Sequence, residues 1–365
     1  MRIIQLVPDI SYGDAVSNDI LAIDKILKAK GFKSEIYAQS ISKNLPVGIV
    51  KSFDLLNVLA DDILILHVAV ATTLNEWITK QKCKKIMIYH NITPPEFFHL
   101  YNPVAENCCN VGLSQTKKLK DTFNLVLAVS EFNKQNLIEM GYTCDIKVLP
   151  ILISFDDYQK TPSKEILEKY DDDFTNILFV GRVVPNKKQE DVILAFDAYQ
   201  KNFNQKSRLF IVGNPTGMEN YDERLKKYVE KLGTRNVIFT GHTKFDEILA
   251  YYRLSDLFLC QSEHEGFCVP LVESMFFEKP IVAYDCCAIG ETLGKGGITL
   301  KEKNPIETAC VMNRILTDSD LREKIIQNQN ERLADFDHGE VESLFWKYMD
   351  VFLKPALAEN NEQNN

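Results

Sequence analysis

The sequence lacks the long apolar runs of a membrane protein and the cysteine spacing of a zinc protein. No uninterrupted apolar stretch reaches the roughly 18–20 residues that a membrane-spanning helix needs. The nine cysteines contain no CxxC or Cys/His ligand spacing, which predicts reduced thiols in a cytoplasmic protein. Cys108-Cys109 and Cys286-Cys287 are adjacent pairs, a poor geometry both for zinc ligation and for ordinary disulfides.

The sequence also lacks a basic excess, low-complexity segments and short solenoid repeats. Its formal net charge of −9 argues against a general nucleic-acid-binding protein. The first predicted strand is not followed by G-x-G-x-x-G, which argues against a dinucleotide oxidoreductase. With 45% hydrophobic and 25% charged residues, the chain has the composition of a soluble globular protein, and its 365 residues favour two domains.

Strand and helix patterns alternate in two series along the chain. The first series predicts strands at residues 3–7, 34–38, 63–67, 85–89, 125–129 and 146–149. The second predicts strands at residues 177–180, 208–212, 237–240, 257–260 and 280–284. A polar segment, residues 161–174, is interpreted as the linker between them. This pattern predicts an α/β fold with two doubly wound, Rossmann-like parallel sheets that face each other across a cleft.

The predicted domains are residues 1–165 and residues 174–336, followed by a helix over residues 337–355 and a disordered tail over residues 356–365. Apolar residues recur at helical spacing in residues 341–352. This stripe suits either packing within the second domain or a helix that crosses back to the first.

Residues 262–273 carry the strongest functional signal. An apolar run, residues 256–260, predicts a buried strand, Gly266 turns the chain, and Pro270 suits the first position of a helix. A helix N-terminus at the carboxyl end of a strand is where α/β sheets bind anionic ligands. Glu265 and Glu273 flank this site, and carboxylates accept hydrogen bonds from hydroxyls. Phosphates beside a polyol indicate a nucleotide-sugar, although each glutamate taken alone could be a surface acid.

Two cations follow the strand that opens the second series. Arg182 would supply a planar fork for phosphate oxygens and Lys187 a point charge. Their turn lies on the same predicted sheet edge as the Glu265 loop, which favours a diphosphate site over a solvated basic turn.

These motifs resemble glycosyltransferase family 4, retaining enzymes with the GT-B fold. The matching segments, in chain order, are residues 11–15, 90–94, 129–132, 180–182 with Lys187, 211–213, 239–241, and 265–267 with Glu273. The resemblance covers most of the chain. It implies two Rossmann-like domains, a C-terminal helix that crosses back to the first domain, and no metal or other cofactor.

The resemblance also implies residue roles. Arg182 and Lys187 correspond to residues that hold the diphosphate, Glu265 to the acid that touches the transferred sugar, and Glu273 to the acid that accepts the ribose hydroxyls. His90 would lie close to the donor sugar, and the Gly13 turn would approach the donor phosphate. The expected catalytic residues are Glu265, His90, Arg182 and Lys187, and the expected substrate-binding residues are Gly13, Gly213, Gly241, His242, Phe267, Cys268, Val269 and Glu273. His67 matches no motif and is interpreted as structural.

Departures from the family pattern concern the donor. The usual Glu-Gly-Phe-Gly has Cys268 in its fourth position, which narrows the space beside the donor sugar without removing the local amides. The loop after the next strand reads Ala288-Ile289-Gly290-Glu291, where the family often has proline before the acid.

The predicted function is a retaining transferase that moves a hexose, with mannose favoured, from a nucleoside-diphosphate sugar to a hydroxyl of a glycan or lipid-linked saccharide. A nucleotide-sugar epimerase and a non-catalytic sugar-nucleotide-binding protein are the alternatives. Lysines in residues 80–85 and 117–120 could form a weak basic face for peripheral contact with the inner face of a membrane, although a solvated surface is the simpler interpretation.

Overall fold

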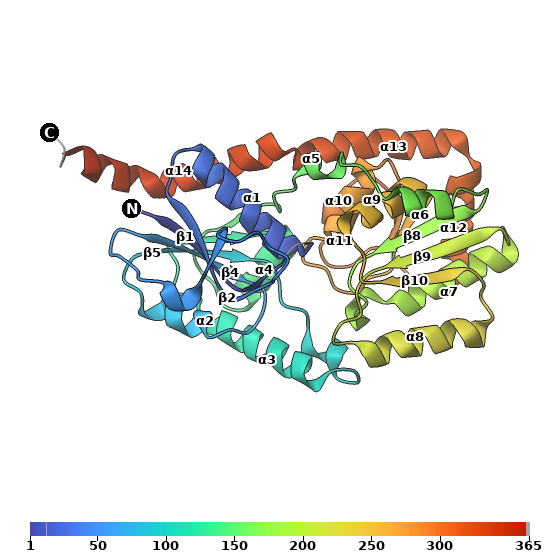
Figure 1. The fold of residues 1–365 in the computed structure, drawn as a ribbon, viewed down its shortest axis with the longest axis horizontal. Helices are drawn as coiled ribbons and strands as arrows, with labels where there is room; N and C mark the ends of the chain where they lie inside the picture. The colour runs from blue at the N-terminus through green and yellow to red at the C-terminus, as the bar shows by residue number, and fades with distance from the viewer. Residues whose placement is uncertain (12, 363–365) are drawn as a thin grey trace. The chain divides into compact units, whose positions relative to one another are not determined.

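The computed structural model describes residues 1–11 and 13–362, with side chains described through residue 350 and at Leu353 (Figure 1). Tyr12, within the predicted glycine turn, and residues 363–365 of the predicted tail therefore lie outside the described part of the chain. Residues 356–362, which were predicted as a disordered tail, instead belong to the last helix, α14 (His338–Glu362). The chain divides into two compact units, each described here by itself. The first comprises residues 1–92, 108–154 and 335–365, and the second comprises residues 93–107 and 155–334.

The first unit contains a seven-stranded sheet in the order β3-β2-β1-β4-β5-β6-β7, and neighbouring strands pair in parallel. Its strands are β1 (Ile3–Ile10), β2 (Ser34–Ile41), β3 (Val50–Ser52), β4 (Ile63–Val68), β5 (Lys84–Tyr89), β6 (Leu125–Ala128) and β7 (Ile146–Val148). Its helices include α1 (Ala15–Ala29), α2 (Leu74–Trp77), α4 (Glu131–Glu139) and α14 (His338–Glu362), and the division splits α3 (Pro103–Lys118) after Asn107. The strand order reverses at β1 and β4, which is where doubly wound sheets place their sites.

The second unit contains a six-stranded sheet in the order β10-β9-β8-β11-β12-β13, also paired in parallel. Its strands are β8 (Thr175–Val180), β9 (Ser207–Val212), β10 (Val237–Gly241), β11 (Leu257–Cys260), β12 (Ile281–Tyr284) and β13 (Ile298–Leu300). Its helices are α5 (Phe155–Tyr158), α6 (Lys164–Lys169), α7 (Gln189–Asn202), α8 (Glu219–Leu232), α9 (Phe245–Leu254), α10 (Val269–Phe276), α11 (Ile289–Leu293), α12 (Pro305–Thr317) and α13 (Ser319–Leu333). The order reverses at β8 and β11.

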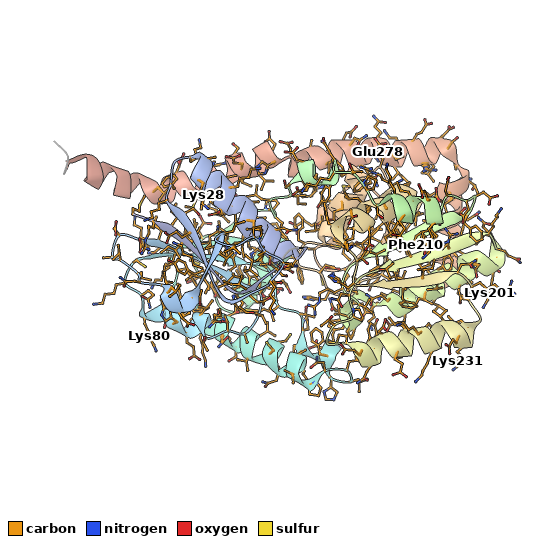
Figure 2. All side chains as sticks on the ribbon, viewed as in Figure 1. Lys28, Lys80, Lys201, Phe210, Lys231 and Glu278 are labelled. Carbon is orange, nitrogen blue, oxygen red and sulfur yellow. The ribbon has the colours of Figure 1, made fainter. Side chains whose placement is uncertain are left out.

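The apolar runs that predict the strands form the cores of both units. In the first sheet, Ile4 and Leu66 come from the neighbouring strands β1 and β4 and are completely buried together. In the second sheet, Phe210 on β9 and Phe258 on β11 belong to one core cluster, and Figure 2 labels Phe210 among the strands. Parallel strands covered on both faces require such continuous apolar sequences, which is why the pattern predicted them well.

Two features were not visible in the sequence pattern. The strands β3 and β13 have three residues each, too few to show a period. The predicted linker, residues 161–174, contains α6, and Tyr170 is buried in the core of the second unit. The last helix, α14, belongs to the first unit, as the family resemblance implied, and its Tyr348 hydroxyl donates to the carbonyl of Val148 (3.1 Å). Phe352, the last residue of the predicted apolar stripe, lies outside the described side chains.

Across the described residues, no helix combines the length and the apolar character that crossing a membrane requires.

Candidate functional site

The exits of β8 and β9 approach each other so closely that only glycine fits. A Cβ atom at Gly213 would lie 1.8 Å from the carbonyl oxygen of Gly181, which is far inside van der Waals contact. The Gly181 N–H donates to the carbonyl of Val212 (3.0 Å), and Gly181 has a φ of 151°. This close pairing turns the chain sharply after β8 and starts the segment that carries Arg182 and Lys187.

Lys187 and Glu265 form a close ion pair in the second unit. The ammonium nitrogen of Lys187 lies 2.6 Å from one carboxylate oxygen of Glu265 and 2.7 Å from the other. Only 7% of the Glu265 side chain and 19% of the Lys187 side chain are exposed. Burial alone would lower the pKa of Lys187, but the charge and hydrogen bonds of Glu265 outweigh it and hold the pKa above its usual value. Lys187 is therefore a charged ammonium at the point where the strand order of the second sheet reverses.

A buried asparagine fixes the two loops that carry this pair. The side-chain amide of Asn186 donates to the carbonyl of His264 (3.0 Å), and the Glu263 N–H donates to the carbonyl of Asn186 (2.8 Å). The sequence offered no motif for Asn186, although its place between two predicted site residues is a signal.

Arg182 does not join the contact between Lys187 and Glu265. Its carbonyl accepts a hydrogen bond from the side chain of Gln189 (2.9 Å), which fixes the backbone. Its guanidinium is exposed and has no hydrogen-bond or ion-pair partner within the described parts of the chain. The predicted pair of cations therefore consists of one ammonium engaged by Glu265 and one exposed guanidinium.

Cys268 occupies a backbone position that favours glycine. Its φ of 73° and ψ of 66° are left-handed, and it is the residue immediately before α10. The family pattern places glycine here, so the structure gives the reason for that preference. The Cys268 side chain is buried, and its sulfur lies within 4.8 Å of the Cys260 sulfur and of a Glu265 carboxylate oxygen. The departure at this position thus puts a thiol beside the Glu265 carboxylate.

Glu273 is engaged by two tyrosines. The hydroxyl of Tyr252 donates to one carboxylate oxygen (2.6 Å), and the hydroxyl of Tyr158 donates to the other (2.9 Å). Burial raises the pKa of Glu273, and the two hydrogen bonds partly offset that shift. The sequence predicted an acid open to ribose hydroxyls, and it missed both tyrosines because they are distant along the chain. Each oxygen retains one lone pair for a further donor.

The remaining predicted residues lie at the carboxyl ends of strands. Gly241 ends β10 with a φ of 68°, and His242 follows it with an exposed side chain. Phe267 is buried, its carbonyl accepts the Thr292 hydroxyl (2.6 Å), and Val269 begins α10. In the first unit, Gly13 has a φ of 85° and precedes α1, whose N-cap is Asp14.

His90 belongs to a buried chain of hydrogen bonds in the first unit. His67 Nδ1 lies 2.9 Å from His90 Nε2, and His67 Nε2 lies 3.0 Å from Gln5 Oε1. The Gln5 amide nitrogen donates to the carbonyl of Ile20 (3.0 Å), so Gln5 Oε1 must accept from His67 Nε2–H. Burial lowers the pKa of His90 to about 3 and that of His67 well below its usual value, so both rings are neutral.

A neutral imidazole has one N–H, which determines the rest of the chain. His67 Nδ1 is the acceptor, and His90 Nε2–H is the donor to it. His90 Nδ1 therefore carries a lone pair, and this atom is buried without a hydrogen-bond partner among the described residues. The interpretation of His67 as merely structural was incomplete, because its contact assigns the tautomer of a predicted site residue.

Asp19 on α1 completes this buried group. One of its carboxylate oxygens accepts the Leu152 N–H (2.8 Å), and the other lies 3.9 Å from His90 Nε2. Burial raises the pKa of Asp19 to about 7, and the hydrogen bond from Leu152 only partly offsets the shift.

Among the described residues, two clusters each bring together three residues of metal-ligating types: Asp19 with His67 and His90, and Cys260 with Glu265 and Cys268. In the second cluster, the Lys187 ammonium already neutralises Glu265, which disfavours a cation there.

One family model matches most of the second unit. Residues 159–332 match the family model for glycosyl transferases group 1. The matched segment lies entirely within the second unit. It contains the Lys187–Glu265 pair, Glu273 and the N-terminus of α10.

Curated relatives of the chain carry glycosyltransferase names. The lipopolysaccharide 1,2-N-acetylglucosaminetransferase of Salmonella typhimurium is 21% identical over 65% of this chain and 64% of that protein. The O-antigen chain mannosyltransferase B of Escherichia coli is 25% identical over 54% of this chain and 53% of that protein. An uncharacterized glycosyltransferase of Methanocaldococcus jannaschii is 28% identical over 54% of this chain and 50% of that protein. The alignments thus span between half and two thirds of these relatives.

Solved structures match the fold over nearly the whole chain. Sucrose-phosphate synthase from Thermosynechococcus elongatus is 15% identical with a TM-score of 0.76, covering 98% of this chain and 100% of that one. HepE of Anabaena, solved with UDP and glucose, is 19% identical with a TM-score of 0.74, covering 96% and 100%. WaaG, a glycosyltransferase involved in lipopolysaccharide biosynthesis, is 15% identical with a TM-score of 0.69, covering 93% and 97%. These glycosyltransferase neighbours confirm the predicted GT-B fold.

Proposed function

We propose that the protein is a retaining glycosyltransferase that moves a hexose from a nucleoside-diphosphate sugar to a hydroxyl of a glycan or lipid-linked saccharide. The observation that carries this proposal is the buried Lys187–Glu265 pair at the strand-order reversal of the second sheet, within the segment that matches the group 1 glycosyl transferases. It places a cation and a carboxylate at one sheet edge, beside the N-terminus of α10.

Lys187 can serve the leaving diphosphate without releasing Glu265. An ammonium has three N–H donors, and the contacts to Glu265 use two of them. The third can bind a phosphate oxygen. When the anomeric C–O bond breaks, the diphosphate gains negative charge, and Lys187, Arg182 and the first amides of α10 would stabilise it. Removing one such preorganised contact costs about 10²–10³ in rate.

Glu265 has a complementary role at the sugar. Its carboxylate retains acceptor capacity beyond the Lys187 contacts, so it can accept a hydrogen bond from a sugar hydroxyl and orient the ring. Its negative charge also favours positive character at the anomeric carbon. Retention follows if the acceptor hydroxyl attacks from the face that the diphosphate leaves, with a phosphate oxygen taking the acceptor proton.

His90 would act in the first unit as a hydrogen-bond acceptor. Its lone pair at Nδ1 suits a hydroxyl of the donor sugar or of the acceptor. No metal is required in this scheme, since the chain's own cations and amides supply the charge for the diphosphate.

The donor proposed for the first assay is a mannosyl nucleotide. Two of the curated relatives are named mannosyltransferases, one from Escherichia coli and one from Mycobacterium tuberculosis. The second is named as GDP-mannose-dependent. Because another relative is named for N-acetylglucosamine transfer, the assay must include UDP-sugars.

A panel of GDP- and UDP-sugars tests the proposal. One donor should raise the melting temperature, and nucleotide release from it should require a saccharide acceptor and persist in EDTA. NMR of the product should show the anomeric configuration of the donor. Lys187→Ala should abolish turnover, whereas Lys227→Ala, a change in an exposed lysine paired with Glu223, should not. Sugar conversion without an acceptor would indicate an epimerase, and binding without any turnover would indicate a binding protein.

A further inference from the structure

A thiol pair lies beside the loop that carries Glu265. The sulfurs of the adjacent residues Cys286 and Cys287 are 3.3 Å apart, and the Cys287 sulfur lies 3.7 Å from His264 Nδ1. Both side chains are partly exposed, and Cys287 has a left-handed backbone with a φ of 55°. They form the turn between β12 and α11.

This turn is hydrogen-bonded to the Glu265 loop at several points. The thiol of Cys286 is 2.9 Å from the carbonyl of Glu263, and the Cys287 sulfur is 3.5 Å from the same oxygen. The N–H of Ala288 donates to the carbonyl of Glu265 (3.3 Å). The two loops therefore form one packed substructure, and a group attached to either sulfur would disturb both.

The surroundings of Cys287 favour its thiolate. The single S–H of Cys286 lies within reach of both the Glu263 carbonyl and the Cys287 sulfur, so it can donate to the Cys287 sulfur. A backbone hydrogen bond from Glu265 and the nearby His264 ring also favour the Cys287 thiolate. Together they lower the pKa of Cys287 to about 5 despite partial burial. The same hydrogen bond raises the pKa of Cys286, so Cys286 keeps its proton when Cys287 loses its own. The acid facing them, Glu263, is neutralised by lysines from two other segments, Lys188 (3.1 Å) and Lys303 (2.8 Å).

We propose that Cys287 is a modification site that takes low-molecular-weight disulfides. Its sulfur attacks one sulfur of R–S–S–R, a new S–S bond joins Cys287 to R–S, and the original S–S bond breaks. The Cys287 sulfur is oxidised, the departing sulfur is reduced, and the released thiolate takes a proton from water.

The product is the mixed disulfide rather than a Cys286–Cys287 disulfide. Neighbouring Cα atoms across a trans peptide are about 3.8 Å apart, below the roughly 4.4–6.8 Å that unstrained disulfides span. A strained internal disulfide would be readily reduced again. The attached group breaks the contacts between the two sulfurs and the Glu263 carbonyl. If the proposed function holds, the modification also weakens binding of the nucleotide-sugar donor at the Glu265 loop.

The test is the reaction of the full chain with glutathione disulfide or an aromatic disulfide at two pH values, followed by peptide mapping. At about pH 6, an ordinary thiol is roughly 0.3% thiolate, whereas Cys287 is mostly thiolate. Because nucleophilicity falls as the pKa falls, the net advantage is about five- to tenfold at pH 6, disappears near pH 7 and is reversed at pH 8. The Cys287 peptide should therefore label before the exposed Cys310 at the lower pH only.

Matched variants separate the contributions. Cys286→Ser keeps a hydroxyl donor and should preserve fast labelling at the lower pH, whereas Cys286→Ala should slow it. Cys310→Ser is the control and should leave the fast phase unchanged. Labelling of Cys310 ahead of Cys287 in the wild-type protein at the lower pH would overturn the proposal, and this measurement requires no variant to fold. Because labelling needs no turnover, its outcome is independent of the proposed transferase activity.

Discussion

Removing one member of the Lys187–Glu265 pair should cost more stability than removing both. Each single change, Lys187→Met or Glu265→Gln, leaves a buried charge without its partner. Breaking a buried pair in this way costs about 3–5 kcal/mol, and the contacts of 2.6 and 2.7 Å place this pair in that class. In the double variant no charge is stranded, so its loss should be smaller than that of either single variant. We expect a coupling energy of about 3 kcal/mol or more.

The assay is urea unfolding of the wild type, both single variants and the double variant, without nucleotide. The same cycle on the exposed pair Lys227–Glu223 is the control, and its urea midpoints should not move. Turnover gives an independent readout, because the double variant should regain stability but remain inactive. A Lys187→Met variant that is as stable as the wild type would contradict the claim that Lys187 and Glu265 form a buried ion pair. Additive losses in the double variant would refute the coupling.

Three further predictions concern other buried groups. Because burial raises the pKa of Asp19 to about 7, the folded state holds a proton that the unfolded state releases, and stability falls as pH rises from about 4 to 7. Asp19→Asn should not lose stability in this way. Measured by urea unfolding, its free energy of unfolding relative to wild type should therefore rise by about 2 kcal/mol or more between pH 5 and pH 8. If the difference between variant and wild type is the same at both pH values, the burial argument is wrong. His67→Leu should lower turnover and change the ¹⁵N shift of His90 Nδ1, whereas His67→Asn, whose amide oxygen can accept from His90, should restore both. Tyr158→Phe should lower the free energy of unfolding by about 1–3 kcal/mol, because it removes a hydrogen-bond donor to Glu273. Saturating nucleotide should reduce that loss, because the ribose hydroxyls supply a replacement donor. An equal loss with and without nucleotide would argue against ribose binding at Glu273.

The strands and the sheet edges were readable from the sequence because both sheets are buried on two faces. Continuous apolar runs identify β1, β8 and β11, and parallel topology places their carboxyl ends at a common edge. The loops after β8 and β11 could therefore be predicted to meet, and the contact between Lys187 and Glu265 confirms it. The short strands β3 and β13 could not be predicted, since three residues carry no periodicity.

The side-chain partners were less predictable. Glu273 could be placed in the first turns of a helix, but nothing in the sequence links it to Tyr158, which is 115 residues away. Cys286 and Cys287 could be recognised as unsuited to an ordinary disulfide, but their contacts with His264 and Glu263 depend on how two crossover loops pack.

The sequence by itself determined which segments are strands, which loops share a sheet edge, and which charged residues those loops carry. These properties follow from local hydrophobic periodicity and from glycine, proline and charge at defined offsets. The tertiary structure alone decided which charges are buried together, which tautomer His90 adopts and which groups surround the thiols of Cys286 and Cys287. Those properties depend on desolvation and on hydrogen-bond partners that are distant along the chain, and no local pattern encodes them.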